Sequence, residues 1–291
     1  MSGLQQLFNA VCLASVYALV AVGYNVVFGV MRIINLAHCD ILMAGAYAGY
    51  FFFCHVSQNL FLCIIFAALF SGLLGSLLEY CIYRPVADAG ANVTLIVATG
   101  ASLFLQYAVI LIFGAAPRGA YFAPTSAVIQ FWGITLPVSK LITLACALLL
   151  LIALEIFLKK TRTGMAMRAV SSNKRFAALT GIRPNSIISL SFFIGSALAG
   201  VCGVLLLSQF SIAPFMGQSF GLKAFCAAVI GGVGSMSGAL LGAFFLAFAE
   251  TFFGTFLNSG LKDILGFFCL VVVILFFPRG LSRQGEEQKR V

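Results

Sequence analysis

Charged residues are scarce in this chain: 9% of its 291 residues are Asp, Glu, Lys or Arg, against roughly 25% in ordinary soluble domains. Hydrophobic residues make up 62%. A soluble fold cannot remove so much apolar surface from water, whereas a bilayer accepts helices of about 20 apolar residues whose backbone hydrogen bonds are all internal. The composition therefore excludes a soluble domain and predicts an all-α polytopic membrane protein.

The sequence also lacks the patterns of several functional classes. It contains no GxxxxGK[ST] loop, so we expect that the chain does not hydrolyse ATP alone. Its nine cysteines lie mostly within apolar stretches and form no CxxC pair, which predicts neither a disulfide framework nor a metal site. The net charge of +9 comes from basic residues near the ends of apolar runs, a pattern of membrane topology rather than of nucleic-acid binding. We expect a chain with no catalytic chemistry and no bound cofactor.

Nine apolar segments are candidates to enter a bilayer. They lie at about 7–30, 36–54, 59–80, 93–114, 138–158, 186–208, 222–234, 237–257 and 262–277. The segment 222–234 is short and ends in glycines, so it is either a crossing or a re-entrant helix buried among its neighbours. The pattern predicts eight to ten transmembrane or re-entrant helices in one membrane domain that covers residues 1–291.

Basic residues set the predicted orientation. The segment 159–185 carries seven Lys and Arg residues and no acidic residue, which places it in the cytoplasm. Counting crossings backward from it puts the loop 115–137 outside, where it either contacts an extracytoplasmic partner or simply joins two spans. Counting forward puts the tail 278–291 in the cytoplasm, provided that 222–234 crosses the membrane.

The predicted cytoplasmic loop is too long and too patterned for a plain hairpin. Residues 163–181 are typical of one or two short helices, in which Ala177 and Ala178 keep one surface slim and Gly181 with Pro184 stops the helix. A slim, basic, exposed helix between two spans is what a cytosolic motor subunit needs as a docking site. The alternative is a helix that rests on anionic lipid headgroups.

A polar interruption separates the first two apolar runs at residues 32–40. Asn35, His38 and Asp40 either line a solute path or gate, since ionisable groups at membrane depth are usually functional, or they form a capped helix start. In the second interpretation Asn35 caps the following helix, and Asp40 favours its positive end or pairs with Arg32.

A glycine-rich run follows the short segment. Four glycines lie between residues 231 and 238, which predicts a broken helix. Gly231, Gly232, Gly234 and Ser235 then either line the path with exposed backbone groups or form a tight interhelical turn.

Glu250 stands in the middle of an apolar segment, where a charge is costly. It is either a proton-coupling group or a hydrogen-bonded structural carboxyl. Lys223 opens the short segment, and we expect it only to extend outward.

Many short motifs follow one another across nearly the whole chain, and their order and gaps are specific even though each one is weak. They resemble the branched-chain amino acid permease family of ABC importers, in particular the first of its two permease types. They are Tyr-Ala-Leu-Val-Ala-Val-Gly at 17–23, Phe-Gly at 28–29, Ile-Asn-Leu-Ala-His at 34–38, Met-Ala-Gly-Ala-Tyr at 43–47, Tyr-Arg-Pro at 83–85, Thr-Gly at 163–164, Arg-Ala at 168–169, Leu-Thr-Gly-Ile at 179–182, Ala-Leu-Ala-Gly at 197–200, Lys-Ala-Phe at 223–225, Gly-Gly-Val-Gly-Ser at 231–235 and Pro-Arg-Gly-Leu at 278–281.

This resemblance implies a mostly helical fold with an internal repeat in a bacterial inner membrane. It implies a second permease subunit, which is a paralogue or a second copy of the chain, and a periplasmic binding protein that delivers the substrate. It also implies cytoplasmic ATPase subunits that bind ATP and Mg²⁺. The residues that match the family's ATPase-coupling region, together with Ala177, are Gly164, Arg168, Ala169, Ala178, Gly181 and Ile182.

The resemblance also indicates a substrate class. Asp40 and the Tyr17-Ala-Leu stretch favour the branch that carries leucine, isoleucine and valine over the sister branch for urea and short amides. A different amino acid as substrate, a secondary transporter and a channel remain alternatives. The chain departs from the family at Cys39, where glycine usually follows the histidine, so the backbone geometry at this point is open.

Overall fold

The computed structural model describes residues 3–33, 35–87, 89–122, 127–131, 134–256, 268, 271–273 and 275. Most of these residues are helical. The helices are α1 (Gly3–Met31), α2 (His38–His55), α3 (Leu60–Leu78), the π-helix η1 (Glu79–Tyr83), α4 (Ala91–Phe113), α5 (Val138–Lys160), α6 (Arg162–Ser172), α7 (Lys174–Leu179), α8 (Pro184–Leu207), α9 (Met216–Gly231) and α10 (Met236–Phe256). Two strands, β1 (Val128–Phe131) and β2 (Ile134–Pro137), pair antiparallel with Val128 opposite Pro137.

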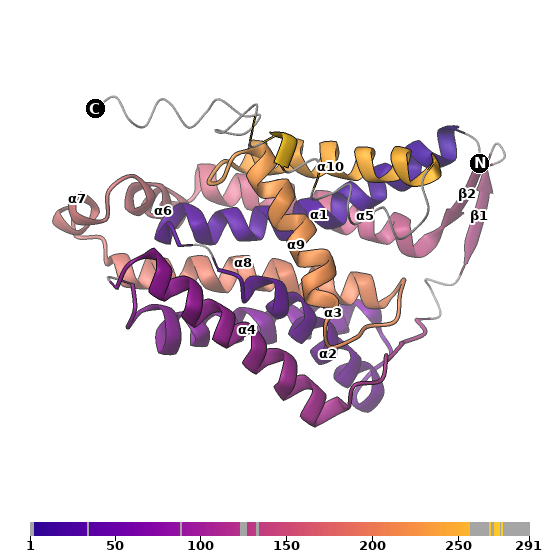
Figure 1. Ribbon diagram of the computed structural model, residues 1–291, viewed down its shortest axis with the longest axis horizontal. Coiled ribbons are helices and arrows are strands. Elements are labelled where there is room, and N and C mark those ends of the chain that lie inside the picture. Colours follow the sequence, from indigo (N-terminus) through magenta and orange to yellow (C-terminus); the bar gives the residue numbers. More distant parts are fainter. Residues whose placement is uncertain are drawn as a thin grey trace.

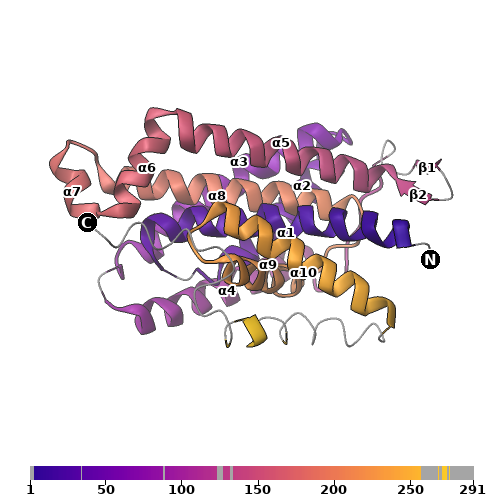
Figure 2. The ribbon, with the colours of Figure 1, turned by 90° about the horizontal axis from the view of Figure 1, so that it is seen from above.

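The long helices α1, α5 and α8 run along the longest axis of the molecule (Figure 1). Helices α6 and α7 lie at one end of this axis, which we call the α7 end. The strands and the start of α1 lie at the other, which we call the hairpin end. Helix α9 crosses the long axis steeply, so that it is seen almost end-on when the molecule is turned by 90° (Figure 2).

The centre of the bundle is formed by α1 and α8. Their most apolar stretches are 83% and 78% buried, against 28% for α4 and 22% for α5. The peripheral helices therefore turn most of their apolar side chains outward, as at Leu111 and Leu149, where a bilayer would cover them. Burial thus separates an inner pair of helices from a lipid-facing outer set.

Small residues allow the inner helices to approach closely. A Cβ added at Gly23 of α1 would lie 2.8 Å from the carbonyl oxygen of Gly195 in α8. A Cβ added at Gly45 of α2 would meet the hydroxyl of Ser71 in α3 at 2.6 Å. In a membrane the hydrophobic effect gives little drive between helices, so such close packing contributes much of the association energy.

Six helices in the described part of the chain are long and apolar enough to cross a bilayer: α1, α3 with η1, α4, α5, α8 and α10. Helices α2 and α9, with 18 and 16 residues, are shorter. The all-α polytopic architecture is confirmed, while the number of crossings, the single domain over 1–291 and the internal repeat stay predictions. The tail 278–291 lies outside the described residues, as does most of the predicted span 262–277.

The segment after α8 differs from the sequence-based expectation. Helix α9 begins at Met216, before the predicted start at 222, because Gln218 and Ser219 interrupt the apolar run without interrupting the helix. Helix α8 starts beside α7 and runs toward the hairpin end, where Ile212 pairs with the backbone of Arg118. The turn after α9 lies beside Arg168 of α6 instead. Residues 208–235 therefore return the chain from the hairpin end toward the α7 end, which is the path that a crossing requires.

The loop between α4 and α5 contains the β1–β2 hairpin, which the sequence analysis missed. Its backbone is tied to the start of α1, because the amide of Gln5 both donates to the carbonyl of Thr135 at 3.0 Å and accepts from its backbone N–H at 2.8 Å. These two hydrogen bonds and the strand pairing fix the described part of the α4–α5 loop against α1. Its short strands carry too few residues for an alternating pattern to stand out from the sequence.

Candidate functional site

The connection between α1 and α2 turns back into the bundle. Helix α1 ends at Met31, and Arg32 adopts a positive φ of 55°, which is uncommon for a residue with a side chain. Helix α2 then begins at His38, whose ring lies against Gly23, two turns or about 12 Å before the end of α1. The first turn of α2 is therefore buried inside the bundle rather than placed at its surface.

The polar residues of this connection do not form the predicted helix cap. The N-cap position of α2 is Ala37, and no side chain caps the helix. Asn35 instead accepts a 2.5 Å hydrogen bond from the Tyr83 hydroxyl of η1. The capping hypothesis for Asn35 is wrong because a partner 48 positions away in the sequence holds its side chain.

Asp40 and Arg32 also have partners other than each other. The Asp40 carboxylate accepts hydrogen bonds from Ser102 at 2.5 Å and from Gln106 at 2.9 Å, both on α4. Arg32 donates to the carbonyl of Ser171 in α6 at 3.2 Å. Of the two roles predicted for Asp40, the pairing with Arg32 is wrong, while its place in the first turn of α2 is confirmed; its carboxylate joins α2 to α4.

His38 is fully buried; its ring interacts with the backbone of Val20, but neither ring nitrogen makes a hydrogen bond of good geometry with a described residue. Its ring meets the edge of Tyr24 at a centroid distance of 5.8 Å. The Tyr24 hydroxyl and the Asn35 Nδ2 are likewise buried without a hydrogen bond to the described residues. Buried polar atoms normally have partners, so this group is a place where water or a passing solute can supply them.

The glycine-rich run forms a tight turn between α9 and α10. Gly231 ends α9, and Gly232 and Gly234 adopt φ values of 108° and 89°, which favour glycine. Asn25 of α1 holds the turn: its amide nitrogen donates to the Ser235 carbonyl at 2.9 Å, and its oxygen accepts from Gly234 N–H at 3.2 Å. The interhelical turn, one of the two interpretations, is confirmed, while a role in the path stays a prediction.

A hollow lies beside this turn. It is bounded by α1, by the end of α5, by α6 and by the turn itself, and its lining includes Asn25, Arg168, Ser171 and Gly234. Two groups of predicted residues, the glycine run and the coupling loop, thus meet at one place near the α7 end.

Glu250 has two partners inside the bundle. The Tyr17 hydroxyl donates to it at 2.7 Å, and the ammonium group of Lys223 lies 2.5 Å from its other oxygen. The side chains of Lys223 and Glu250 are 14% and 9% exposed. The expectation that Lys223 only extends outward is wrong, because this pairing draws its ammonium inward and joins α9 to α10 and α1.

The predicted cytoplasmic loop folds into two short helices. The Thr161 hydroxyl caps α6 by accepting from Gly164 N–H at 3.0 Å, and the Asn173 side chain caps α7 by accepting from the N–H groups of Arg175 and Phe176. Helix α7 ends before Gly181, whose φ of 84° favours glycine. The loop therefore has a defined shape and is not a flexible linker.

The coupling residues fall into an inward and an outward set. Gly164 is buried, since an added Cβ would lie 2.6 Å from the Cα of Leu158, whereas Arg168 is exposed and donates back to the carbonyl of Leu158 at 2.7 Å. Ala177 is 4% exposed, so the prediction that it belongs to the outer surface is wrong: it faces inward on the short helix. The outward set consists of Arg168, Ala178 and Gly181, while Ala169 and Ile182 are half-buried. Three apolar side chains of α6 and α7 outside the predicted set are also exposed: Met165, Phe176 and Leu179.

The coupling loop is attached to the core at its middle. The Ser171 hydroxyl donates to the Gly29 carbonyl of α1 at 2.5 Å, in addition to the hydrogen bond from Arg32 to the Ser171 carbonyl. Sequence reasoning missed Asn25, Tyr83, Ser102, Gln106 and Ser171. Each of these residues is a polar side chain within or beside an apolar run. That pattern marks the residue but does not show which distant residue it bonds to.

The fold and these sites define a multi-pass α-helical membrane protein with a buried polar connection and a structured basic loop at one end. The family model for the permease component of the branched-chain amino acid transport system matches residues 6–275. The chain belongs to this family.

The curated relatives agree over nearly the full length. The chain is 35% identical to the high-affinity branched-chain amino acid transport system permease protein LivH of Salmonella typhimurium, over 98% of this chain and 97% of that protein. It is 35% identical to the corresponding protein BraD of Pseudomonas aeruginosa over the same shares. A similarity that covers 45% of the chain, at 30% identity, links it to the autoinducer 2 import system permease protein LsrC of Photorhabdus laumondii.

Proposed function

We propose that the chain is the membrane-spanning permease subunit of an ATP-driven importer that carries leucine, isoleucine and valine across the inner membrane of a bacterium. In this proposal the permease subunit catalyses no reaction itself. ATP and Mg²⁺ bind to separate cytoplasmic ATPase subunits, a periplasmic binding protein delivers the substrate, and a second permease subunit, paralogous or identical, completes the path.

The observation that carries this proposal is the exposed surface of α6 and α7. Phe176 and Leu179 are 69% and 82% exposed at the α7 end, next to Ala178 and between basic residues. Apolar side chains in a basic, capped helix pair are costly to leave in water, so a protein partner that covers them gains binding energy. Because the Ser171 hydrogen bonds fasten the same helices to α1, a partner that moves them moves the core.

Replacing Ala178 by Asp tests this docking surface. A charge in the middle of the surface should abolish co-purification of the ATPase subunits and stop uptake, because it must be desolvated on docking. Ala89→Asp is the matched control: it adds the same charge to another exposed position before α4. Unchanged co-purification and uptake in Ala178→Asp, at normal expression, would reject the docking role.

We place the solute path along the α1–α2 connection at Asn35, His38 and Asp40, with the glycine turn and Glu250 as further candidates. His38→Ala should lower leucine uptake while the ATPase subunits still co-purify. His55→Ala is the control, since this second histidine is exposed at the far end of α2. Equal uptake in the two variants would remove His38 from the path.

Two alternatives are separated by simple measurements. A secondary transporter or channel would move leucine in proteoliposomes without ATP or ATPase subunits, whereas the proposed importer would not. A permease for urea, short amides or another solute would show no ATP-dependent uptake of labelled leucine, whereas the proposed importer takes up leucine in competition with isoleucine and valine.

A further inference from the structure

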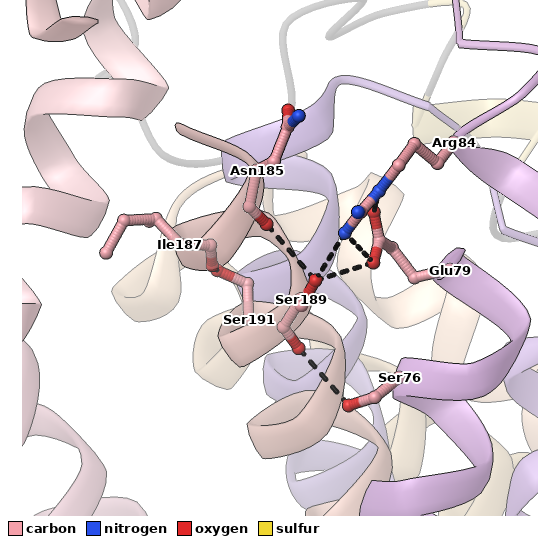
Figure 3. Close-up of polar contacts among 7 residues, drawn as sticks. All are labelled: Ser76, Glu79, Arg84, Asn185, Ile187, Ser189 and Ser191. Carbon is pink, nitrogen blue, oxygen red and sulfur yellow. Dashed lines mark hydrogen bonds and ion pairs between the residues drawn. The ribbon is translucent and has the colours of Figure 1, made fainter. Parts of the chain in front are cut away.

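A closed polar cluster joins η1 to the second turn of α8 at the α7 end (Figure 3). The Glu79 carboxylate accepts from Nε of Arg84 at 3.0 Å and from its Nη2 at 2.9 Å, the two-pronged geometry of strong Arg–carboxylate pairs. The Ser189 hydroxyl donates to Glu79 at 2.6 Å and accepts from Arg84 at 2.8 Å. We call Glu79, Arg84 and Ser189 the Glu79 cluster.

The π-helical turn makes this cluster possible. In an α-helix, residues five apart point about 140° away from each other, and only residues three or four apart are neighbours. The π-helix bonds residue i+5 to residue i, here Arg84 N–H to the Glu79 carbonyl at 2.7 Å, which places the two side chains on one face. Such wide turns often mark functional sites, and this one serves to pair Glu79 with Arg84.

Burial makes the cluster hard to separate. Glu79 is 1% exposed, whereas the Arg84 side chain is 34% exposed. The hydrogen bond with Glu79 raises the pKa of Arg84, so the guanidinium stays charged in the pair. Separating η1 from α8 would keep the pair of Glu79 with Arg84 but would remove the Ser189 hydroxyl from a carboxylate that is 1% exposed, which favours movement of η1 together with the start of α8.

The cluster lies close to the proposed ATPase-docking helices. Helix α8 begins at Pro184, directly after α7 and the Gly181 turn, and Ser189 follows five positions later, about 7.5 Å along the helix. A displacement of α7 therefore reaches Ser189 through less than two turns of helix. Ser76 of α3 adds a second link, since its hydroxyl donates to the Ser189 carbonyl at 3.4 Å.

The other end of η1 touches the candidate gate. Tyr83 is the last residue of η1, is fully buried, and donates to Asn35 in the α1–α2 connection. Two residues of η1, four positions apart, thus bond to different neighbours: Glu79 to Ser189 of α8, and Tyr83 to Asn35 in the connection that leads to His38. Coupling between distant sites is carried by such contiguous bonded and packed elements.

We propose that η1 transmits movement of the docking helices to the α1–α2 connection. Glu79 at the start of η1 and Arg84 directly after its end act with Ser189 of α8 as positioning residues, and Tyr83, the last residue of η1, holds Asn35. This proposal rests on the proposed docking of an ATPase at α6 and α7. It assigns a role to residues outside both the proposed docking surface and the proposed solute path.

The test uses the complete transporter, with its partner subunits and binding protein, in proteoliposomes. Leucine uptake and substrate-stimulated ATP hydrolysis are measured together. Glu79→Gln, which keeps the shape but removes the charge, should lower uptake about tenfold while ATP hydrolysis stays within about twofold, so that more ATP is used per leucine. Glu155→Gln, which removes the exposed pair with Lys159 on α5, is the matched control and should change neither rate.

Tyr83→Phe keeps the ring and removes only the hydroxyl, so it preserves the fold if Glu79→Gln fails to assemble. It should show the same rise in ATP used per leucine. If both residues act in one path, the double variant should be no worse than the more severe single variant, whereas independent effects multiply. Unchanged ATP use per leucine in Tyr83→Phe, or multiplied losses in the double variant, would overturn the proposal.

Failure of this proposal is distinguishable from failure of the docking proposal. Ala178→Asp reports on docking through co-purification of the ATPase, which Glu79→Gln should leave intact. If Ala178→Asp loses the ATPase but Glu79→Gln and Tyr83→Phe transport with normal ATP use, the docking role stands and the transmission role falls. If Ala178→Asp retains the ATPase, docking at this surface is rejected first.

Discussion

The buried pair of Lys223 and Glu250 gives the sharpest prediction for stability. The ammonium and carboxylate lie 2.5 Å apart with only 14% and 9% of their side chains exposed, and the pair joins α9 to α10. Removing one partner of a buried pair leaves a charge in a poorly polar environment, which costs about 3–5 kcal/mol. In Lys223→Met the hydroxyl of Tyr17 still donates to Glu250, so we expect the lower end, about 3 kcal/mol.

The double variant separates charge from packing. Lys223→Met with Glu250→Gln removes both charges and keeps side chains of similar volume, and replacing a buried pair by apolar or neutral groups is often neutral. We therefore expect the double variant to recover more than half of the loss. Unfolding of the purified protein in mixed micelles, titrated with a denaturing detergent, gives the free energy of unfolding of each form.

Two results would refute this reasoning. A single variant Lys223→Met as stable as the starting protein would mean that the pair is solvated and contributes nothing. A double variant that loses the sum of the two single losses would mean that the side chains act by shape and not by charge.

Three further predictions follow from the geometry. Gly232→Val forces a branched side chain to a φ of 108°, which costs of order 1–3 kcal/mol and should abolish uptake by distorting the α9–α10 turn; full uptake would reduce that turn to a passive connection. Gly195→Leu drives a side chain into the α1 backbone at Gly23 and should lower the free energy of unfolding by about 1–3 kcal/mol or more, measured by the same detergent titration. Gly100→Leu is the control, because an added Cβ at Gly100 meets nothing within 4 Å. Asp40→Asn can keep hydrogen bonds to α4 while losing the charge, so reduced leucine uptake at unchanged stability supports a solute-contacting carboxylate, whereas normal uptake leaves Asp40 as an anchor for α4.

The helices could be located from the sequence because apolar runs and their polar interruptions are local signals. The predicted runs 7–30, 93–114 and 138–158 differ from α1, α4 and α5 by only a few residues at each end. The early start of α9 was missed because Gln218 and Ser219 break the apolar run without breaking the helix. The hairpin was missed because strands of four residues are too short for a periodic signal.

The partners of the polar residues could not be located in the same way. For Asn35 the sequence offers a helix cap as one of two interpretations, because its neighbours in sequence begin a helix, whereas its hydrogen bond comes from Tyr83, 48 positions away. Lys223 was expected to extend outward because Glu250 stands 27 positions away on another helix. Ala177 and Ala178 are adjacent and chemically identical, and only the packing of α7 decides that the first is buried and the second exposed.

These partners also rank the candidate path residues. Three of the polar residues, Asn25, Asp40 and Glu250, form hydrogen bonds that join one helix to another element. A membrane fold needs such bonds because apolar contact alone does not specify which helices pack together. The α1–α2 connection differs, because His38 and the amide nitrogen of Asn35 remain buried without hydrogen bonds to the described residues. A solute can bind these atoms without breaking a bond between helices, so this connection is a stronger candidate for solute contact than the glycine turn or Glu250. Within this connection, Tyr83 of η1 donates to the Asn35 oxygen, which leaves the Asn35 amide nitrogen as the group without a partner among the described residues.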